Sequence, residues 1–106
     1  MLTITTDQGN KIKLGTNQKE NQQIIDEAEP TWVWFHADKF SSGHAVIETD
    51  SPTKQEIIQA ALLVKERCKL KHYPKGKIIF CPVKNLKKTG IPGEVDLKRR
   101  PKTVTV

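Results

Sequence analysis

Two histidines, His36 and His44, lie eight residues apart in the stretch that also contains both tryptophans of the chain. An imidazole takes up and releases protons near neutral pH, so a pair of them can serve as general base and general acid. On RNA they would act on the 2′-hydroxyl and on the leaving oxygen, with Lys39 or Lys88 beside the phosphate. A metal-independent ribonuclease is therefore one function that these residue types permit.

The same two histidines have two other interpretations. An imidazole can stack on an exposed base or donate to a phosphate, and the indole of Trp34 offers a face that contributes ~1–3 kcal/mol per stacked base. Alternatively, His36 and His44 form a cross-strand pair that is hydrogen-bonded to the neighbouring backbone and has only a structural role. The residue types are compatible with all three interpretations.

The elements that must position these side chains are indicated by the alternation of polar and apolar residues. Residues 32–37 alternate with the period of a β-strand, and Val33 and Phe35 fall on the same side. The alternation resumes in residues 44–48 after a short polar break, which predicts a hairpin. A shared buried face requires Phe35 to lie opposite Ala45, because a slip of one residue would turn every side chain over.

The same register sets His36 opposite His44 on the other face of the hairpin. That face would also carry Trp32 and Trp34, a combination that is unusual on a surface with no role beyond contact with solvent. We therefore expect this face to be exposed and to bind nucleic acid through Trp34, His36 and His44, with Lys39 at the end of the hairpin.

The remaining pattern predicts an α+β fold in a single domain of residues 1–106, with a mainly antiparallel sheet built from hairpins and two helices packed on it. One helix begins at Thr16 or Asn17 and is stopped by Pro30. The other begins at Ser51 or at Thr53 and has an apolar stripe, which we expect to be formed by Ile57, Ile58, Ala61, Leu62, Val64 and Cys68. The other predicted strands are residues 2–6, 11–15, 77–81, 95–97 and 103–106, and the basic segments 69–77 and 83–94 are predicted to be loops.

Positive charge is concentrated in the second half of the chain. Residues 1–60 have five basic and nine acidic residues, whereas residues 61–106 have thirteen basic and three acidic residues, a net charge of +10. Such a potential favours a polyanion, most simply a nucleic acid backbone, and would also attract an acidic membrane surface. It does not distinguish RNA from DNA, so DNA binding is an alternative. We expect phosphate contacts from two clusters: Lys84, Lys87 and Lys88, and Lys98, Arg99, Arg100 and Lys102.

Other classes of protein are disfavoured. The spacing of Cys68, His72 and Cys81 matches no tetrahedral metal site, so we expect neither a metal nor a cofactor. We expect both cysteines to be reduced, and we expect His72 and Tyr73 to form a loop pair that can add a stacking surface. The chain has no apolar run of the ~18 residues that a membrane helix needs and no signal peptide, which favours a cytoplasmic protein without membrane insertion.

An ordered set of short motifs resembles the NFACT-R (NFACT RNA-binding) family. The motifs are residues 15–21 (GTNQKEN), 34–36 (WFH) and 43–46 (GHAV), followed by an Ala-containing helix, Lys87-Lys88 and a terminal TVTV strand. The resemblance extends from about Gly15 onward and is greatest to eukaryotic single-module relatives that carry a coiled coil. Trp32 stands where the family usually has an acidic residue, and Thr16 stands where it has an arginine.

The resemblance implies an RNA-binding role without catalysis. In the long members of the family, the module accompanies domains that recognise tRNA on a stalled large ribosomal subunit. The implied partners are therefore tRNA or rRNA, in ribosome-associated quality control. No accompanying domain lies within these 106 residues, so we expect the binding step only. The resemblance also adds Asn17, Lys19 and Asn21 to the candidate nucleic-acid-binding residues.

Overall fold

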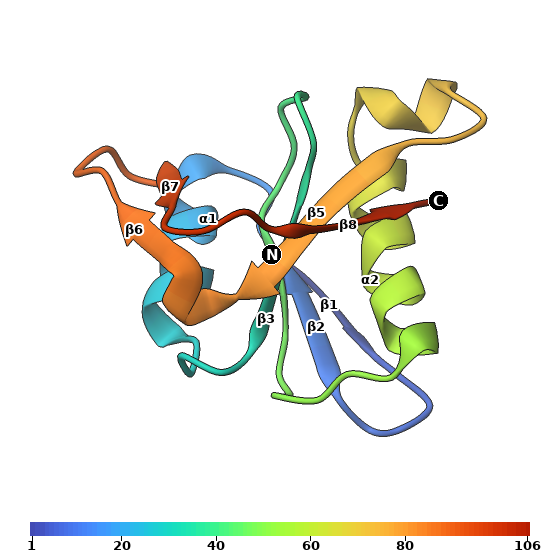
Figure 1. Cartoon of the computed structure of the whole chain (residues 1–106), viewed down its shortest axis with the longest axis horizontal. Helices are drawn as coiled ribbons and strands as arrows, with labels where there is room; N and C mark the ends of the chain where they lie inside the picture. Colours follow the sequence, from blue (N-terminus) through green and yellow to red (C-terminus); the bar gives the residue numbers. More distant parts are fainter.

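The computed structural model describes all 106 residues and confirms the α+β fold (Figure 1). Six antiparallel strands form the main sheet in the order β1-β2-β4-β3-β5-β8, and β6 and β7 form a separate two-stranded sheet. The strands are β1 (Leu2–Thr5), β2 (Lys11–Leu14), β3 (Val33–Ala37), β4 (Ala45–Ile47), β5 (Lys77–Pro82), β6 (Leu86–Lys88), β7 (Val95–Leu97) and β8 (Lys102–Thr105). The helices are α1 (Gln18–Glu27) and α2 (Lys54–Glu66), with short 3-10 helices η1 (Lys69–His72) and η2 (Val83–Asn85).

The central hairpin has the predicted register. Phe35 pairs with Ala45 and Val33 with Ile47, so the apolar side chains of β3 and β4 share one buried face. The strand β3 is also paired with β5 on its other side, which places it inside the sheet. A strand in that position is fixed on both edges by backbone hydrogen bonds, and its side chains are correspondingly well defined.

Helix α2 covers the face that carries Phe35. Of the two predicted starting points, Thr53 is the N-cap, and it forms a reciprocal capping box with Glu56. Ala60, Ala61 and Val64 are fully buried against the sheet. Leu62 was expected in this buried stripe, and that expectation is wrong: the side chain is exposed because the buried side of the helix runs through the two alanines instead.

Helix α1 covers the opposite face, which the sequence led us to expect at the surface. Asn17 caps the helix by accepting a hydrogen bond from the backbone N–H of Glu20. Ile24 and Ile25 then pack against Trp34 in a second apolar cluster. The expectation of an exposed aromatic face is therefore wrong, because α1 must bury its own apolar side and the indole is the largest apolar surface available on that face.

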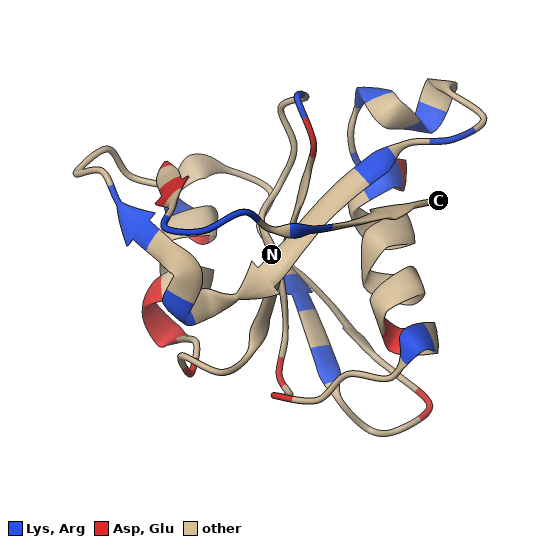
Figure 2. Ribbon diagram, in the orientation of Figure 1, with Lys and Arg blue, Asp and Glu red and all other residues tan.

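The carboxy-terminal half has more regular structure than predicted. Residues 83–88, expected in a loop, form η2 and β6, and β6 pairs with β7 across a turn in which Gly90 and Gly93 have positive φ. The expected loop at residues 69–77 begins with η1. Basic residues mark β6 and the segment that leads into β8 (Figure 2). Neither α-helix is long and apolar enough to span a membrane.

Candidate nucleic-acid interface

A cleft of about 1040 Å³, which we call the histidine cleft, lies between the loop before α1, the β3–β4 loop and the β6–β7 loop. Six of the residues that the sequence singled out for nucleic-acid binding line it: Asn17, Asn21, Trp34, His36, Lys39 and His44. They come from α1 and its N-cap, from β3 and from the β3–β4 loop. The fold thus brings together side chains that are up to 27 residues apart in the sequence.

Three glycines allow these loops to approach one another. A Cβ atom on Gly43 would lie 2.3 Å from the carbonyl oxygen of Gly15, and one on Gly93 would lie 2.9 Å from the carbonyl oxygen of Gln18. A Cβ atom on Gly15 itself would lie 2.0 Å from Oδ1 of Asn21. Contacts this short are not seen for real side chains, so the walls of the cleft depend on glycine at these positions.

His44 is held inside the cleft by hydrogen bonds on its backbone and its ring. Nε1–H of Trp34 donates to Nδ1 of His44 over 2.9 Å, and the backbone N–H of His44 donates to Oδ1 of Asn21 over 3.1 Å. His44 is only 5% exposed and Trp34 only 2%. Burial and the neighbouring His36 lower the pKa of His44 to about 4, although a hydrogen bond with the Gly93 backbone opposes the shift. His44 is therefore neutral at pH 7, with its proton on Nε2.

His36 is the more accessible of the two imidazoles. Its ring stacks on Trp34 with an angle of 13° between the planes, and its centroid lies 4.9 Å from that of His44. Nδ1–H donates to the backbone oxygen of Ala37 over 2.7 Å. Burial lowers the pKa of His36, and hydrogen bonds with the Ala37 and Ser42 backbones oppose the shift. Both histidines thus favour the neutral form.

This arrangement is poorly suited to acid–base catalysis on RNA. A general acid must present a proton to the leaving oxygen, but His44 is buried, neutral, and bonded through Nδ1 to Trp34. Trp34 likewise presents no face on which a base could stack, because its indole lies under α1. Trp34 and His44 therefore support the cleft as buried side chains. We withdraw the expectation that they contact bases.

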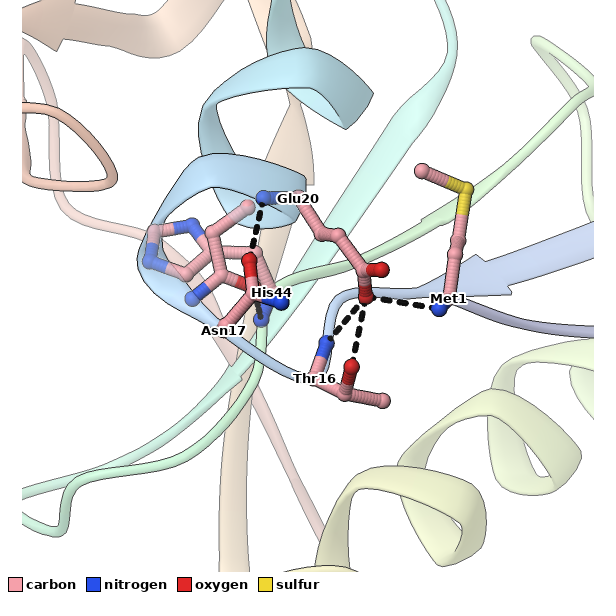
Figure 3. A network of polar contacts seen from close by, with 6 residues as sticks. Met1, Thr16, Asn17, Glu20 and His44 are labelled. Atoms are coloured by element: carbon pink, nitrogen blue, oxygen red, sulfur yellow. Dashed lines mark hydrogen bonds and ion pairs between the residues drawn. The ribbon is translucent and has the colours of Figure 1, made fainter.

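The start of α1 lines the cleft through Thr16, Asn17 and Gln18, and Figure 3 shows the polar contacts that hold this segment. One carboxylate oxygen of Glu20 accepts hydrogen bonds from the backbone N–H and the hydroxyl of Thr16, and it lies 2.7 Å from the amino group of Met1. The amino group, and then Thr16, lower the pKa of Glu20 to about 2. Thr16 thus helps to fix the start of α1. Lys19 is exposed and does not line the cleft.

A second cleft, of about 700 Å³, gathers five of the seven residues of the two predicted phosphate-binding clusters, and we call it the basic cleft. Its basic residues are Lys84, Lys98, Arg99, Arg100 and Lys102, and Asp50 is its single acidic residue. None of the five forms an ion pair.

The segment that carries Arg99 and Arg100 is fixed to η2. The side-chain amide of Asn85 donates to the backbone oxygen of Arg99 over 3.0 Å, and the backbone N–H of Lys98 donates to the backbone oxygen of Asn85 over 2.9 Å. Nζ of Lys98 donates to the backbone oxygen of Lys84 over 3.2 Å. The backbone that carries Lys98, Arg99 and Arg100 is therefore held in place before any ligand binds.

The fold divides the predicted cluster of Lys84, Lys87 and Lys88. Lys88 forms an ion pair with Asp26 of α1, and it lowers the pKa of that carboxyl. Lys87 lies directly opposite Asp96 in the β6–β7 ladder. Only Lys84 reaches the basic cleft, so the other two lysines have acidic neighbours that reduce the potential they present.

One exposed aromatic residue was missed by sequence reasoning. Phe40, in the β3–β4 loop, lies 6.0 Å from Tyr73, measured between ring centroids. The signal was present, because Phe40 is a single large apolar residue between polar ones, but the sequence does not show that Tyr73 lies beside it.

Comparisons with known proteins agree with the resemblance. Residues 1–98 match the family described as the NFACT protein RNA binding domain. The chain is 33% identical to coiled-coil domain-containing protein 25 of Danio rerio over an alignment of 88 residues, and the match covers 74% of this chain and 41% of that protein. It is 34% identical over 100 residues to Protein JLP2 of Saccharomyces cerevisiae, covering 83% of this chain and 48% of that protein.

A solved structure has the same fold. The C-terminal part of the fibronectin/fibrinogen-binding protein from Streptococcus suis superposes with a TM-score of 0.89 and 29% identity, covering 98% of this chain and 43% of that one. The chain therefore spans less than half the length of these relatives.

Proposed function

The chain belongs to the NFACT RNA-binding domain family, and on this basis we propose that it binds tRNA or ribosomal RNA by holding phosphates in the basic cleft. The observation that carries the proposal is the set of five exposed basic side chains in that cleft, none of which has an ion-pair partner. Cations without partners are available to a phosphate backbone, and their binding releases counterions from the RNA.

The chemistry of the cleft supports phosphate rather than base recognition. Arg99 and Arg100 present planar guanidinium groups, which can hold a phosphate through two parallel hydrogen bonds. Lys84, Lys98 and Lys102 add point charges around them. Phosphate contacts position a nucleic acid and carry no sequence information directly, so selectivity would depend on the shape of the RNA.

The rim of the histidine cleft supplies further contacts in this proposal. Lys39 is exposed, His36 is partly exposed, and the amide of Asn17 lies at the start of α1. We assign these three residues to the RNA surface, while Asn21 acts from within by positioning the backbone of His44. Lys19 is a peripheral contact, since it is exposed outside both clefts.

Titration with labelled nucleic acids tests this function. The chain should bind tRNA more tightly than duplex DNA of similar length, and the logarithm of its affinity should fall linearly with the logarithm of salt concentration. Each phosphate contact contributes a slope of roughly 0.7 to 0.9. Absence of binding to tRNA at moderate salt would refute the proposal, and equal affinity for duplex DNA would favour the DNA alternative.

We further propose a cellular setting, which rests on the resemblance to the long members of the family. We place the protein in the cytoplasm, on ribosomal particles in ribosome-associated quality control. The test is sedimentation of the protein with large ribosomal subunits at low salt and its release at high salt. Migration with free protein under both conditions would contradict the ribosomal setting without affecting RNA binding.

A further inference from the structure

Phe40 and Tyr73 form an exposed aromatic pair that neither apolar cluster of the fold uses. Their exposed fractions are 37% and 51%, and their rings lie 6.0 Å apart with an angle of 54° between the planes. Neither residue packs against the apolar cluster under α2 or the one under α1. Two neighbouring aromatic side chains that are this exposed outside both clusters form an apolar surface patch, which is the kind of surface that contacts a ligand or a partner.

Both rings are presented by segments that the fold fixes. The β3–β4 loop, which carries Phe40, is held at its base: the backbone N–H of Asp38 donates to the backbone oxygen of Lys77 over 3.0 Å, and the backbone N–H of Ala37 donates to the hydroxyl of Ser42 over 3.1 Å. On the other side, the backbone N–H of Tyr73 donates to the backbone oxygen of Leu70, which is buried. Nζ of Lys65 donates to the backbone oxygen of Pro74, the next residue along.

The two segments that carry the pair are rich in basic residues. Its neighbours in the two segments include six exposed basic residues: Lys39, Arg67, Lys69, Lys71, Lys75 and Lys77. None of them forms an ion pair, and Figure 2 shows basic residues along η1 and the loop that follows it. The acidic residues of these segments are Asp38 and Glu66 only. A phosphate backbone would therefore find positive charge on both sides of the rings.

We infer that Phe40 and Tyr73 form a stacking platform for an unpaired nucleotide of single-stranded RNA, whose phosphates are held by the flanking lysines. The inference rests on the proposed RNA-binding function and assigns the type of RNA element recognised. Aromatic rings flanked by cations are the usual means by which proteins bind single strands, because every base has a π-face. Both rings remain partly open to solvent, so a base can reach them.

The platform continues into the histidine cleft. Lys39 and Phe40 line that cleft together with Arg67 and Lys69, so a strand that stacks at its mouth can pass directly into it. The platform thus supplies the aromatic surface that the buried indole of Trp34 cannot. An acidic membrane would also be attracted to aromatic and basic side chains, but it would make no use of a cleft beneath the rings.

The test compares a single-stranded RNA of about ten pyrimidines with a blunt duplex RNA, using fluorescence anisotropy and the whole chain. Phe40→Ala combined with Tyr73→Ala should weaken binding of the single strand about 5- to 100-fold, which corresponds to the loss of about one stacked base. Duplex binding and the salt slope should not change, because no charge is removed. Phe40→Tyr combined with Tyr73→Phe, which keeps both rings, should retain wild-type affinity.

Leu62→Ala is the matched control, since it removes an exposed apolar side chain from α2. Unchanged single-strand binding in the double alanine variant would overturn the inference, as would an equal loss for the duplex. If the variant loses only its binding to phosphatidylserine vesicles, the platform is a membrane contact and the inference fails. Failure of the wild-type chain to bind any RNA would instead refute the proposed function itself.

Discussion

Nε1 of Trp34 donates a hydrogen bond to Nδ1 of His44 over 2.9 Å, and both side chains are almost completely buried. Their sequence positions suggested a surface for bases, but the bond makes them part of the interior between the sheet and α1. An indole N–H can only donate, so its burial requires an acceptor. His44 supplies that acceptor as long as its ring stays neutral.

Replacement of His44 by phenylalanine should therefore lower stability. The change leaves Nε1–H of Trp34 buried without an acceptor, and we expect a loss of about 1–3 kcal/mol in the free energy of unfolding, measured with urea. His44→Gln keeps an acceptor at this position and should lose less. Equal losses in the two variants would show that the hydrogen bond contributes little.

Stability should also fall between pH 6.5 and about pH 4. The pKa of His44 is lowered from its ordinary 6.5 to about 4 in the folded protein, so the unfolded chain binds more protons throughout this range. The contribution of neutral His44 to the free energy of unfolding is complete above pH 6.5 and is lost as the pH falls toward 4. It amounts to roughly 3 kcal/mol at most.

Urea unfolding at pH 7.5, 6 and 5 measures this loss of stability. His36, whose pKa is also lowered, should add to the wild-type slope. The slope of unfolding free energy against pH should be smaller in His44→Gln, because that variant has lost one of the two titrating rings. An unchanged slope in the variant would contradict the assignment to His44.

Local sequence patterns were sufficient to predict most of the fold. The alternation in residues 32–37 predicted the correct register because a shift of one residue would have exposed Phe35. Of the two starts predicted for α2, the one at Ser51 is wrong and the alternative at Thr53, with its capping box to Glu56, is confirmed.

What could not be predicted was which face of the sheet each helix covers. The amphipathic pattern of α1 shows that it must bury one side, but not that this side meets Trp34. Tertiary packing of this kind decides whether an aromatic residue recognises a ligand or fills the core. The ion pair of Lys88 with Asp26 and the contact of Phe40 with Tyr73 could not be predicted either, because the partners are distant in the sequence.

Glu56 should be important for stability although it is charged and buried. Burial by itself raises the pKa of its carboxyl, but hydrogen bonds from Asn10, Thr6 and Thr53 outweigh this and lower it. We expect Glu56→Ala to cost about 2–4 kcal/mol, because it removes a cap and leaves buried donors unpaired. Gln55→Ala, at an exposed position in the same turn, should be nearly neutral in thermal unfolding.

Because the pKa of Glu56 is lowered, stability should also depend on pH in a second, more acidic range. A carboxyl whose folded pKa is lowered stabilises the protein above its ordinary value of 4.5, and this contribution is lost as the pH falls below that value. Wild-type protein should therefore lose further stability below about pH 4.5, and Glu56→Gln should not show this additional loss. A variant that follows the wild-type curve below pH 4.5 would contradict the role of the carboxyl.

Gly43 should not tolerate a side chain. A Cβ atom there would lie 2.3 Å from the backbone oxygen of Gly15, which is held in place because the backbone N–H of Gly15 donates to the oxygen of His44. Gly43→Ala should destabilise the chain by about 1–3 kcal/mol, as overpacking does elsewhere. Ser41→Ala, an exposed position in the same loop, should leave the melting temperature unchanged. Equal melting temperatures for the two variants would mean that the loops separate without cost.

Removal of two charges should matter more in the basic cleft than on β6. Arg99→Ala combined with Arg100→Ala removes two cations without ion-pair partners, so tRNA affinity should fall and the salt slope should decrease by about one for each phosphate that the variant no longer binds. Lys87→Ala combined with Lys88→Ala removes the same charge next to Asp96 and Asp26, and we expect a smaller effect from it. Anisotropy titrations at several salt concentrations measure both quantities. If the two double variants behave alike, the RNA responds to net charge alone and the basic cleft is not a distinct phosphate site.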